Sequence, residues 1–136
     1  MLLNKIKKLE EKEKIEKEDS SFNELSSFLF NSINEFHKIH LKTTSYSKHI
    51  ALGECYDSLR NKTDELIEMY QGCYNQLINC SNNINIDYTN ELDLIVIVID
   101  KLKEYKEKEK DSAIINLIEE IIGFLYRIKY KLNFLN

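Results

Sequence analysis

Apolar residues recur at steps of three and four positions along most of this chain, which is the spacing of one face of an α-helix. The first such run follows Asp19, Ser20 and Ser21, which are good helix N-caps. The run ends near Lys42, and its apolar stripe consists of Phe22, Leu25, Leu29, Ile33, Phe36 and His40. This pattern predicts a first helix over residues 22–42.

A second helix is predicted from Ser45 to about Gln71. Thr43, Thr44 and Ser45 form a short polar break that caps it. Its apolar stripe is Leu52, Cys55, Leu59, Leu66 and Tyr70. Gly72 either ends or bends this helix, and a helical continuation towards Cys80 is expected.

The segment from Ser81 to Asp87 is the clearest loop, because Asn, Ser and Asp compete with helix through local side-chain bonds. We expect it to cross from one end of a bundle to the other. The following run, Leu92 to Ile99, is rich enough in β-branched residues to suggest a strand. It continues without a break into charged helical sequence, however, and this favours a third helix.

Asp111 and Ser112 predict the start of a fourth helix. Its wide apolar face consists of Ile114, Leu117, Ile118, Ile121, Leu125, Ile128 and Leu132. Four helices with two short links and one longer middle link predict an all-α four-helix bundle over residues 20–136.

Residues 1–19 differ from the rest of the chain. Residues 4–19 carry few apolar positions and many opposite charges four residues apart, which support a solvated helix. We interpret them as a charged N-terminal helical extension. A basic nucleic-acid-binding tail is the alternative, but the acidic residues roughly balance the lysines.

Composition agrees with a helical domain. The chain has 136 residues, of which 43% are apolar and 31% charged, with no proline and only three glycines. This length fits one domain, and so few helix breakers indicate helix nearly throughout. The net charge of −4 argues against nucleic acid or anionic lipid as a partner.

The cysteines and the longest apolar run bear on location. Cys55, Cys73 and Cys80 are odd in number and lack the spacing of a secreted disulfide framework, so we expect reduced thiols. The longest aliphatic run, residues 94–99, lies between two aspartates and is too short to span a membrane. We therefore expect a cytoplasmic protein, in a host cell or a virion, with no membrane segment.

The second helix carries the candidate chemistry. His49, Asp64 and Glu68 lie along one line beside its apolar stripe, and all three are good metal-ligand types. His49 and Asp64 are about 22 Å apart along a helix, too far to share an ion. Two such helices packed antiparallel about a two-fold axis near Asp57 would set His49 of one copy against Asp64 and Glu68 of the other. The pattern predicts a metal site shared within a homo-oligomer.

The stretch from His40 to His49, followed by Tyr56, Asp57, Asp64 and Glu68, resembles the signature of the Dps-like miniferritins. It is most similar to a small ferritin-like family of phages and other viruses. The resemblance covers residues 36–72, with a weaker match at residues 130–132. It implies a ferritin-like fold, assembly as a dimer or a larger shell, and ferrous iron oxidation. The implied iron ligands are His49, Asp64, Glu68 and His40, with His37 as the alternative to His40.

The chain departs from the miniferritin pattern in several places. Gly53 stands where the family has an aspartate, Leu41 stands where a tryptophan is common, and the link between the first two helices is shorter. No Glu-x-x-His motif is present, which excludes the usual ferritin centre inside one bundle.

Two functions remain open from the sequence. One is iron binding and ferroxidation at the shared site, and the other is a metal-free helical bundle that acts as a structural or interaction protein. Nucleophilic catalysis is disfavoured, because the chain has no Gly-x-Ser-x-Gly motif and no phosphate-binding glycine loop.

Overall fold

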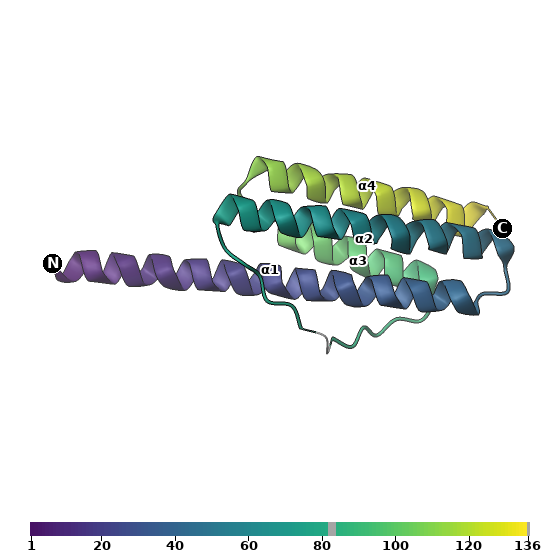
Figure 1. Cartoon of the computed structure of the whole chain (residues 1–136), viewed down its shortest axis with the longest axis horizontal. Coiled ribbons are helices and arrows are strands. Elements are labelled where there is room, and N and C mark those ends of the chain that lie inside the picture. Colours follow the sequence, from purple (N-terminus) through teal and green to yellow (C-terminus); the bar gives the residue numbers. More distant parts are fainter. Residues whose placement is uncertain (82–83, 136) are drawn as a thin grey trace.

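The computed structural model describes residues 1–81 and 84–135, and the side chains of all of these except residues 14–20. The described residues form four helices, α1 (Leu2–Lys42), α2 (Tyr46–Tyr74), α3 (Glu91–Lys106) and α4 (Ser112–Phe134) (Figure 1). The predicted all-α class is confirmed for this part of the chain. In particular, residues 92–99 are helical and not a strand.

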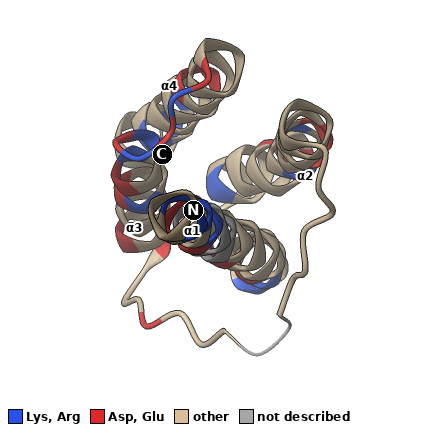
Figure 2. Cartoon of the chain, turned by 90° about the vertical axis from the view of Figure 1, so that its left-hand side faces the viewer, with Lys and Arg blue, Asp and Glu red and all other residues tan. Residues whose placement is uncertain are grey.

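The four helices lie side by side around one core. α1 packs against α2 and α3, and α4 packs against the same two helices (Figures 1 and 2). Figure 2 shows both signs of charge on the outer sides of the helices. A charged side chain that needs water is thereby kept out of the apolar centre.

The long link between α2 and α3 crosses the length of the molecule. Near the start of α2, Lys48 pairs with Glu91 at the start of α3, with 2.8 Å between Nζ and Oε1. At the other end of α2, Tyr74 bonds to Glu109, just beyond the end of α3. The two helices therefore run in the same direction, and residues 75–90 return along the outside to join them (Figure 1).

The crossing link is fastened to α1. The Asn79 and Ser81 amides donate to Asn23 and Ser27, at 3.0 and 2.7 Å. Further along, the Tyr88 hydroxyl donates to Glu35 at 2.9 Å. The predicted loop at residues 81–87 lies in this segment, although residues 82 and 83 are outside the described part of the chain.

The predicted apolar stripes form the core. The side chains of Phe22, Leu29 and Phe36 on α1 and of Leu52, Leu59 and Leu66 on α2 are buried. Every apolar residue predicted for the inward face of the fourth helix is also buried. His40, placed by its spacing at the end of the first stripe, is only half-buried.

The helix ends follow local side-chain chemistry. The predicted caps Ser45 and Asp111 accept backbone N–H bonds at the starts of α2 and α4. Asn75 ends α2 with φ of 53°, a left-handed conformation that Asn adopts more easily than most residues. α2 passes through Gly72 without ending, and the expected helical continuation towards Cys80 is wrong, because Asn75 reverses the chain first.

α1 is one helix from residue 2 onwards. The predicted boundary between residues 19 and 20 falls inside it, among residues whose side chains the structure does not describe. Residues 1–13 are exposed, and this part of α1 projects beyond the other three helices (Figure 1). Among the described residues, no helix combines the length and apolar character needed to cross a membrane.

Candidate functional site

The tight turn between α1 and α2 brings two histidines together. Thr43 ends α1 by donating its backbone N–H to the Ile39 carbonyl at 3.0 Å. Two residues later Ser45 caps α2, its hydroxyl accepting the Lys48 N–H. Because only three residues separate the helices, the last turn of α1 faces the first turn of α2. His40 lies on the first of these turns and His49 on the second.

His40 and His49 form a reciprocal pair. Their rings are stacked, with centroids 3.7 Å apart and planes 18° from parallel. Nδ1 of His40 is 2.6 Å from the backbone carbonyl of His49. In return, Nδ1 of His49 is 2.8 Å from the carbonyl of His40. The pair therefore ties the end of α1 to the start of α2.

These two bonds define the state of each ring. A carbonyl oxygen only accepts hydrogen bonds, so Nδ1 must carry the hydrogen in both histidines. In the neutral ring, Nε2 then keeps a free lone pair. Histidines that bind metals commonly have this arrangement, in which one ring nitrogen binds the metal and the other donates to a carbonyl. Each ring is half-buried, so its position is constrained by packing as well as by the hydrogen bond.

Gly53 makes room for this pair. A β-carbon at position 53 would come within 3.0 Å of Cε1 and 3.3 Å of Nδ1 of His40. The ring of His40 thus lies directly against the backbone of α2. An aspartate here, as in the miniferritin pattern, would displace the ring from its observed position, which gives a packing reason for this departure.

His37 belongs to the same group of rings. It is exposed and stacks on Tyr56, with centroids 4.2 Å apart and planes 17° from parallel. Tyr56 in turn meets His40 edge-on at 5.2 Å. On α2, the Arg60 guanidinium lies 5.8 Å from the centre of the Tyr56 ring. We call His37, His40, His49, Tyr56 and Arg60 the histidine cluster.

Asp64 and Glu68 lie apart from the histidine cluster. Both are exposed on α2, farther along the helix from His49. The separation of His49 and Asp64 remains about 22 Å along the axis, because α2 is continuous between them. Of the predicted ligands, one chain brings together His37, His40 and His49 and leaves the two carboxylates outside the cluster.

The stacking also limits what one chain can bind. The lone pair of an imidazole nitrogen lies in the plane of its ring, and two stacked rings have nearly parallel planes. Nε2 of His40 and Nε2 of His49 therefore cannot point at one ion unless a ring turns. In the part of the chain that the structure describes, no group of three or more His, Cys, Asp or Glu side chains is placed to hold a metal.

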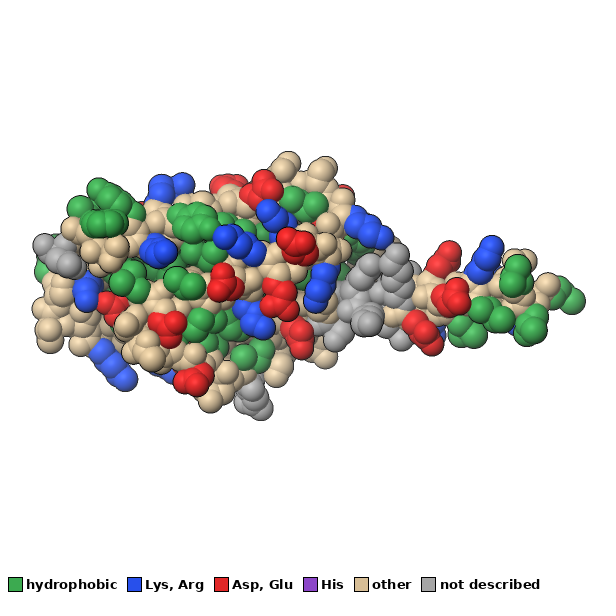
Figure 3. All heavy atoms as spheres, turned by 180° about the vertical axis from the view of Figure 1, so that it is seen from behind, with side chains coloured by type: hydrophobic (Ala, Val, Ile, Leu, Met, Phe, Trp, Pro, Cys, Tyr) green, Lys and Arg blue, Asp and Glu red, His purple; other side chains and the backbone are tan. Residues whose placement is uncertain are grey.

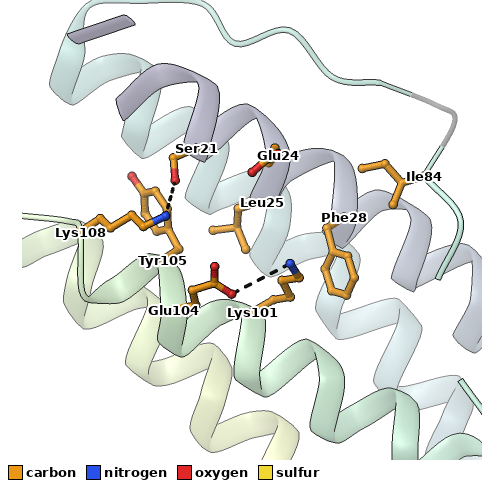
Figure 4. A pocket seen from close by; sticks show the side chains of 9 residues that line it. All are labelled: Ser21, Glu24, Leu25, Phe28, Ile84, Lys101, Glu104, Tyr105 and Lys108. Carbon is orange, nitrogen blue, oxygen red and sulfur yellow. Dashed lines mark hydrogen bonds and ion pairs between the residues drawn. The ribbon is translucent and has the colours of Figure 1, made fainter. Parts of the chain in front are cut away.

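A pocket of about 270 Å³ lies elsewhere, between α1, α3 and the crossing link (Figure 4). Both lysines in its lining already contact neighbours in the wall. Lys108 Nζ is 3.4 Å from the Ser21 hydroxyl, and Lys101 pairs with Glu104 at 4.0 Å. Leu25, which lines this pocket, lies about 22 Å from His40 along the axis of α1. The pocket is therefore separate from the histidine cluster.

A buried carboxylate closes the opposite end of the molecule. Glu109 accepts hydrogen bonds from the hydroxyls of Tyr105, at 2.5 Å, and Tyr74. It also accepts the backbone N–H groups of Lys110 and Asp111, both at 3.1 Å. Burial, followed by the bond to Glu109, raises the pKa of both tyrosines well above the usual value. With four donors, Glu109 joins the end of α2 to the connection between α3 and α4.

Sequence reasoning identified the histidines but missed the way they are held. The reciprocal bonds use backbone carbonyls, which leave no trace in residue identity. One signal was present, since Gly53, Tyr56 and Arg60 follow His49 at steps of four, three and four residues and so share its helix face.

The fold and the histidine cluster define an all-α protein in which two histidines tie the first two helices together. A family model described as Family of unknown function (DUF5856) matches residues 40–132, which is more than half of the chain. The chain therefore belongs to this family. The match begins at His40 and includes His49, Asp64 and Glu68, whereas His37 precedes it. In the same comparisons, no curated protein and no solved structure matched the chain.

Proposed function

We propose that this protein is a ferritin-like, Dps-like homo-oligomer that binds ferrous iron as a substrate at a site shared between two copies. The observation that carries the proposal is the bond from Nδ1 of His49 to the His40 carbonyl. It fixes the ring and keeps Nε2 as the nitrogen that can bind a metal.

The topology supports the ferritin-like part of the proposal. Ferritin-like bundles have one long crossover between two antiparallel helix pairs. Here the three-residue turn joins α1 to α2, a short connection joins α3 to α4, and residues 75–90 cross between the pairs. Each helix also packs against two neighbours, as four helices around one core require.

The donor set fits iron only when a second copy contributes. Within one chain, the two carboxylates are too far from His49, and the stacked rings do not converge on one point. Across a two-fold axis near Asp57, however, exposed Asp64 and Glu68 of one copy would face His49 of the other. Imidazole and carboxylate together suit iron. His40 or His37 would complete the set.

The residues have distinct roles in this proposal. His49 binds the ferrous ion through Nε2, while Asp64 and Glu68 neutralise its charge and stabilise the ferric product. His40 positions His49 through its backbone carbonyl. Dioxygen or peroxide would be the oxidant, and binding at open positions on the ion would make oxidation fast.

The direct test is an anaerobic ferrous iron titration followed by exposure to dioxygen or peroxide. It compares the unchanged chain with His49→Ala, with Glu68→Ala and with the control Glu65→Ala. Glu65 is exposed on the same helix and lies about 160° around the helix axis from His49. We expect stoichiometric binding and fast oxidation in the unchanged chain and the control, and loss of both in the other two variants.

The alternative function is a metal-free helical scaffold that binds other proteins. The close packing of His40 on Gly53 favours it, because a histidine pair that joins two helices has a structural role without any metal. Equal absence of iron binding in all four chains would support this scaffold and contradict the iron site.

A further inference from the structure

Glu109 is unlike the other carboxylates of the molecule. The view from behind shows acidic side chains on the surface among lysines and arginines (Figure 3). Glu109 is instead only 8% exposed. Among the residues with described side chains, no lysine or arginine forms an ion pair with it. A carboxylate without a paired cation takes up a proton more readily than a paired one, so Glu109 can act as a proton acceptor.

The two oxygens of Glu109 have different partners. Oε1 accepts the Tyr74 hydroxyl and the backbone N–H groups of Lys110 and Asp111. Oε2 accepts the Tyr105 hydroxyl at 2.5 Å. A carboxylate oxygen has two lone pairs, so three donors leave Oε1 no room for a proton, whereas Oε2 has room. The Tyr105 hydroxyl therefore donates to the oxygen that can take its proton.

The ring of Tyr105 is shielded from other protein chains but not from small molecules. It is 7% exposed and packs against Phe22, with ring centroids 5.4 Å apart. It also lines the pocket between α1 and α3, where Figure 4 shows it near Ser21 and Lys108. A small molecule in this pocket would lie against the ring, whereas a tyrosine of another protein could not reach it.

The chemistry of a phenol links electron loss to proton loss at this position. Burial, followed by the bond to Glu109, raises the pKa of Tyr105 well above its usual value, so the hydroxyl keeps its proton at ordinary pH. A phenol that loses an electron becomes a strong acid and must release this proton. Oε2 of Glu109 is at hydrogen-bond distance to receive it. The chain has no tryptophan, so its eight tyrosines are the aromatic side chains that are most easily oxidised.

Tyr88 provides a matched comparison, because its hydroxyl also donates to a carboxylate. The acceptor is Glu35, at 2.9 Å. Glu35 pairs with Lys38 at 3.2 Å, and a neighbouring cation lowers the proton affinity of a carboxylate. Glu109 has no such ion pair, so oxidation of Tyr105 is more favourable than oxidation of Tyr88.

We propose that Tyr105 is a redox-active tyrosine that reacts with small one-electron oxidants, with Glu109 as its proton acceptor. One electron passes from Tyr105 to the oxidant, the phenolic O–H bond breaks, and the proton forms a new O–H bond at Oε2 of Glu109. The products are a neutral tyrosyl radical, a neutral carboxylic acid and the reduced oxidant. An external one-electron reductant, such as a thiolate or ascorbate, returns the electron, and the proton moves back. This activity goes beyond the proposed iron site, because it uses none of the residues of that site and needs no iron.

The test is pulse radiolysis of the full chain with the azide radical as the oxidant, in buffer that contains a chelator and no iron. Time-resolved absorption follows the tyrosyl radicals. Every chain carries Cys73→Ser and Cys80→Ser, because these thiols are not fully buried and would reduce the radical. Tyr105→Phe removes the reactive hydroxyl, Glu109→Gln removes the proton acceptor, and Tyr88→Phe is the matched control. Circular dichroism checks that each variant retains its helices.

We expect a long-lived radical on Tyr105 in the chain with only the two cysteine substitutions. It should decay at least about tenfold more slowly than radicals on exposed tyrosines, which couple between molecules. Tyr105→Phe should lose this slow phase, and Tyr88→Phe should retain it. In Glu109→Gln the long-lived radical should form at least about tenfold more slowly, because an amide does not take the proton.

Three results would overturn the proposal. One is the absence of a slow phase before any tyrosine is changed. Another is a slow phase of equal size in Tyr105→Phe, which would place the radical on a different residue. The third is an unchanged rate of formation in Glu109→Gln. If that variant does not fold, the rate in D₂O decides instead, since a rate equal to that in H₂O would contradict coupled proton transfer. All of these measurements exclude iron, so failure here is distinguishable from failure of the iron site.

Discussion

Gly53 is the residue on which the histidine pair depends most directly. Glycine in the middle of a helix costs about 1 kcal/mol relative to alanine. At position 53 that cost is offset by the approach of the His40 ring, which a β-carbon would meet at 3.0 Å. Gly123 on α4 has nothing within 4 Å of the same position, so it provides a matched comparison.

We expect Gly123→Ala to raise the free energy of unfolding by up to about 1 kcal/mol. Gly53→Ala receives the same helical gain but must displace the His40 ring, which is held by its bond to the His49 carbonyl and by stacking on the His49 ring, at a cost of about 1–3 kcal/mol. Urea denaturation of both variants measures the difference. Equal stabilisation in the two variants would show that the His40 ring is not fixed against α2.

Glu109 gives a second prediction at this scale. Glu109→Gln keeps the shape but replaces one accepting oxygen by an NH₂ group, which cannot accept the hydroxyl of Tyr105 or Tyr74. We expect a loss of about 1–3 kcal/mol in the free energy of unfolding, the cost of leaving a buried polar group unpaired. Glu107→Gln is the control, because Glu107 is exposed. A loss as small as in the control would mean that the hydrogen bond to the replaced oxygen contributes no net stability.

At the residue scale, the sequence predicted which side chains are candidates but not their contacts. The position of His49, Asp64 and Glu68 along one side of a helix follows from their spacing and the helical repeat, so it could be predicted. The stacking of His37 on Tyr56 and the bonds of the histidine pair depend on how α1 meets α2. These are tertiary contacts, and the helical repeat of the sequence does not predict them.

At the scale of the elements, local side-chain chemistry decides where α2, α3 and α4 begin. Ser45 and Asp111 were predicted as caps because their oxygens satisfy backbone N–H groups within three residues. The end of α2 was less predictable. Gly72 was expected to end or bend the helix, but Asn75 adopts the left-handed conformation that ends it. Both glycine and asparagine adopt this conformation readily, so residue type alone did not decide between the two positions.

The ion pair between Lys48 and Glu91 links two elements and predicts a pH dependence. Burial alone would raise the pKa of Glu91, but the hydrogen bond and charge of Lys48 outweigh it, and this pKa lies below its usual 4.5. The pair therefore stabilises the fold above about pH 4.5, and this contribution is lost as the pH falls through the lowered pKa.

We expect Lys48→Met to lower the free energy of unfolding by about 1 kcal/mol at neutral pH. The difference from the unchanged chain should shrink as the pH falls below about 4.5, because Glu91 then becomes protonated in both. Lys38→Met is the control, since Lys38 is 61% exposed in its pair with Glu35. A difference that stays constant with pH would show that the effect of Lys48 is not electrostatic.

At the scale of the whole molecule, the proposed iron site makes a prediction about mixed subunits. A His49→Ala chain still supplies Asp64 and Glu68, and a Glu68→Ala chain still supplies His49. Random pairing in an equal mixture, after the subunits have exchanged, puts one complete site in half of the pairs. We expect about one quarter of the iron capacity of the unchanged protein to return on mixing. If neither variant binds alone and none returns on mixing, the site is not shared.

The crossing link also has a consequence for how the protein folds. α1 with α2, and α3 with α4, are helical hairpins whose contacts are close in the sequence. Local contacts of this kind form quickly, whereas joining the hairpins requires closure of the loop over residues 75–90. The bonds from Asn79, Ser81 and Tyr88 to α1 need only one hairpin and the link. We therefore expect the link to attach to the first hairpin early, so that the second hairpin docks last and sets the refolding rate.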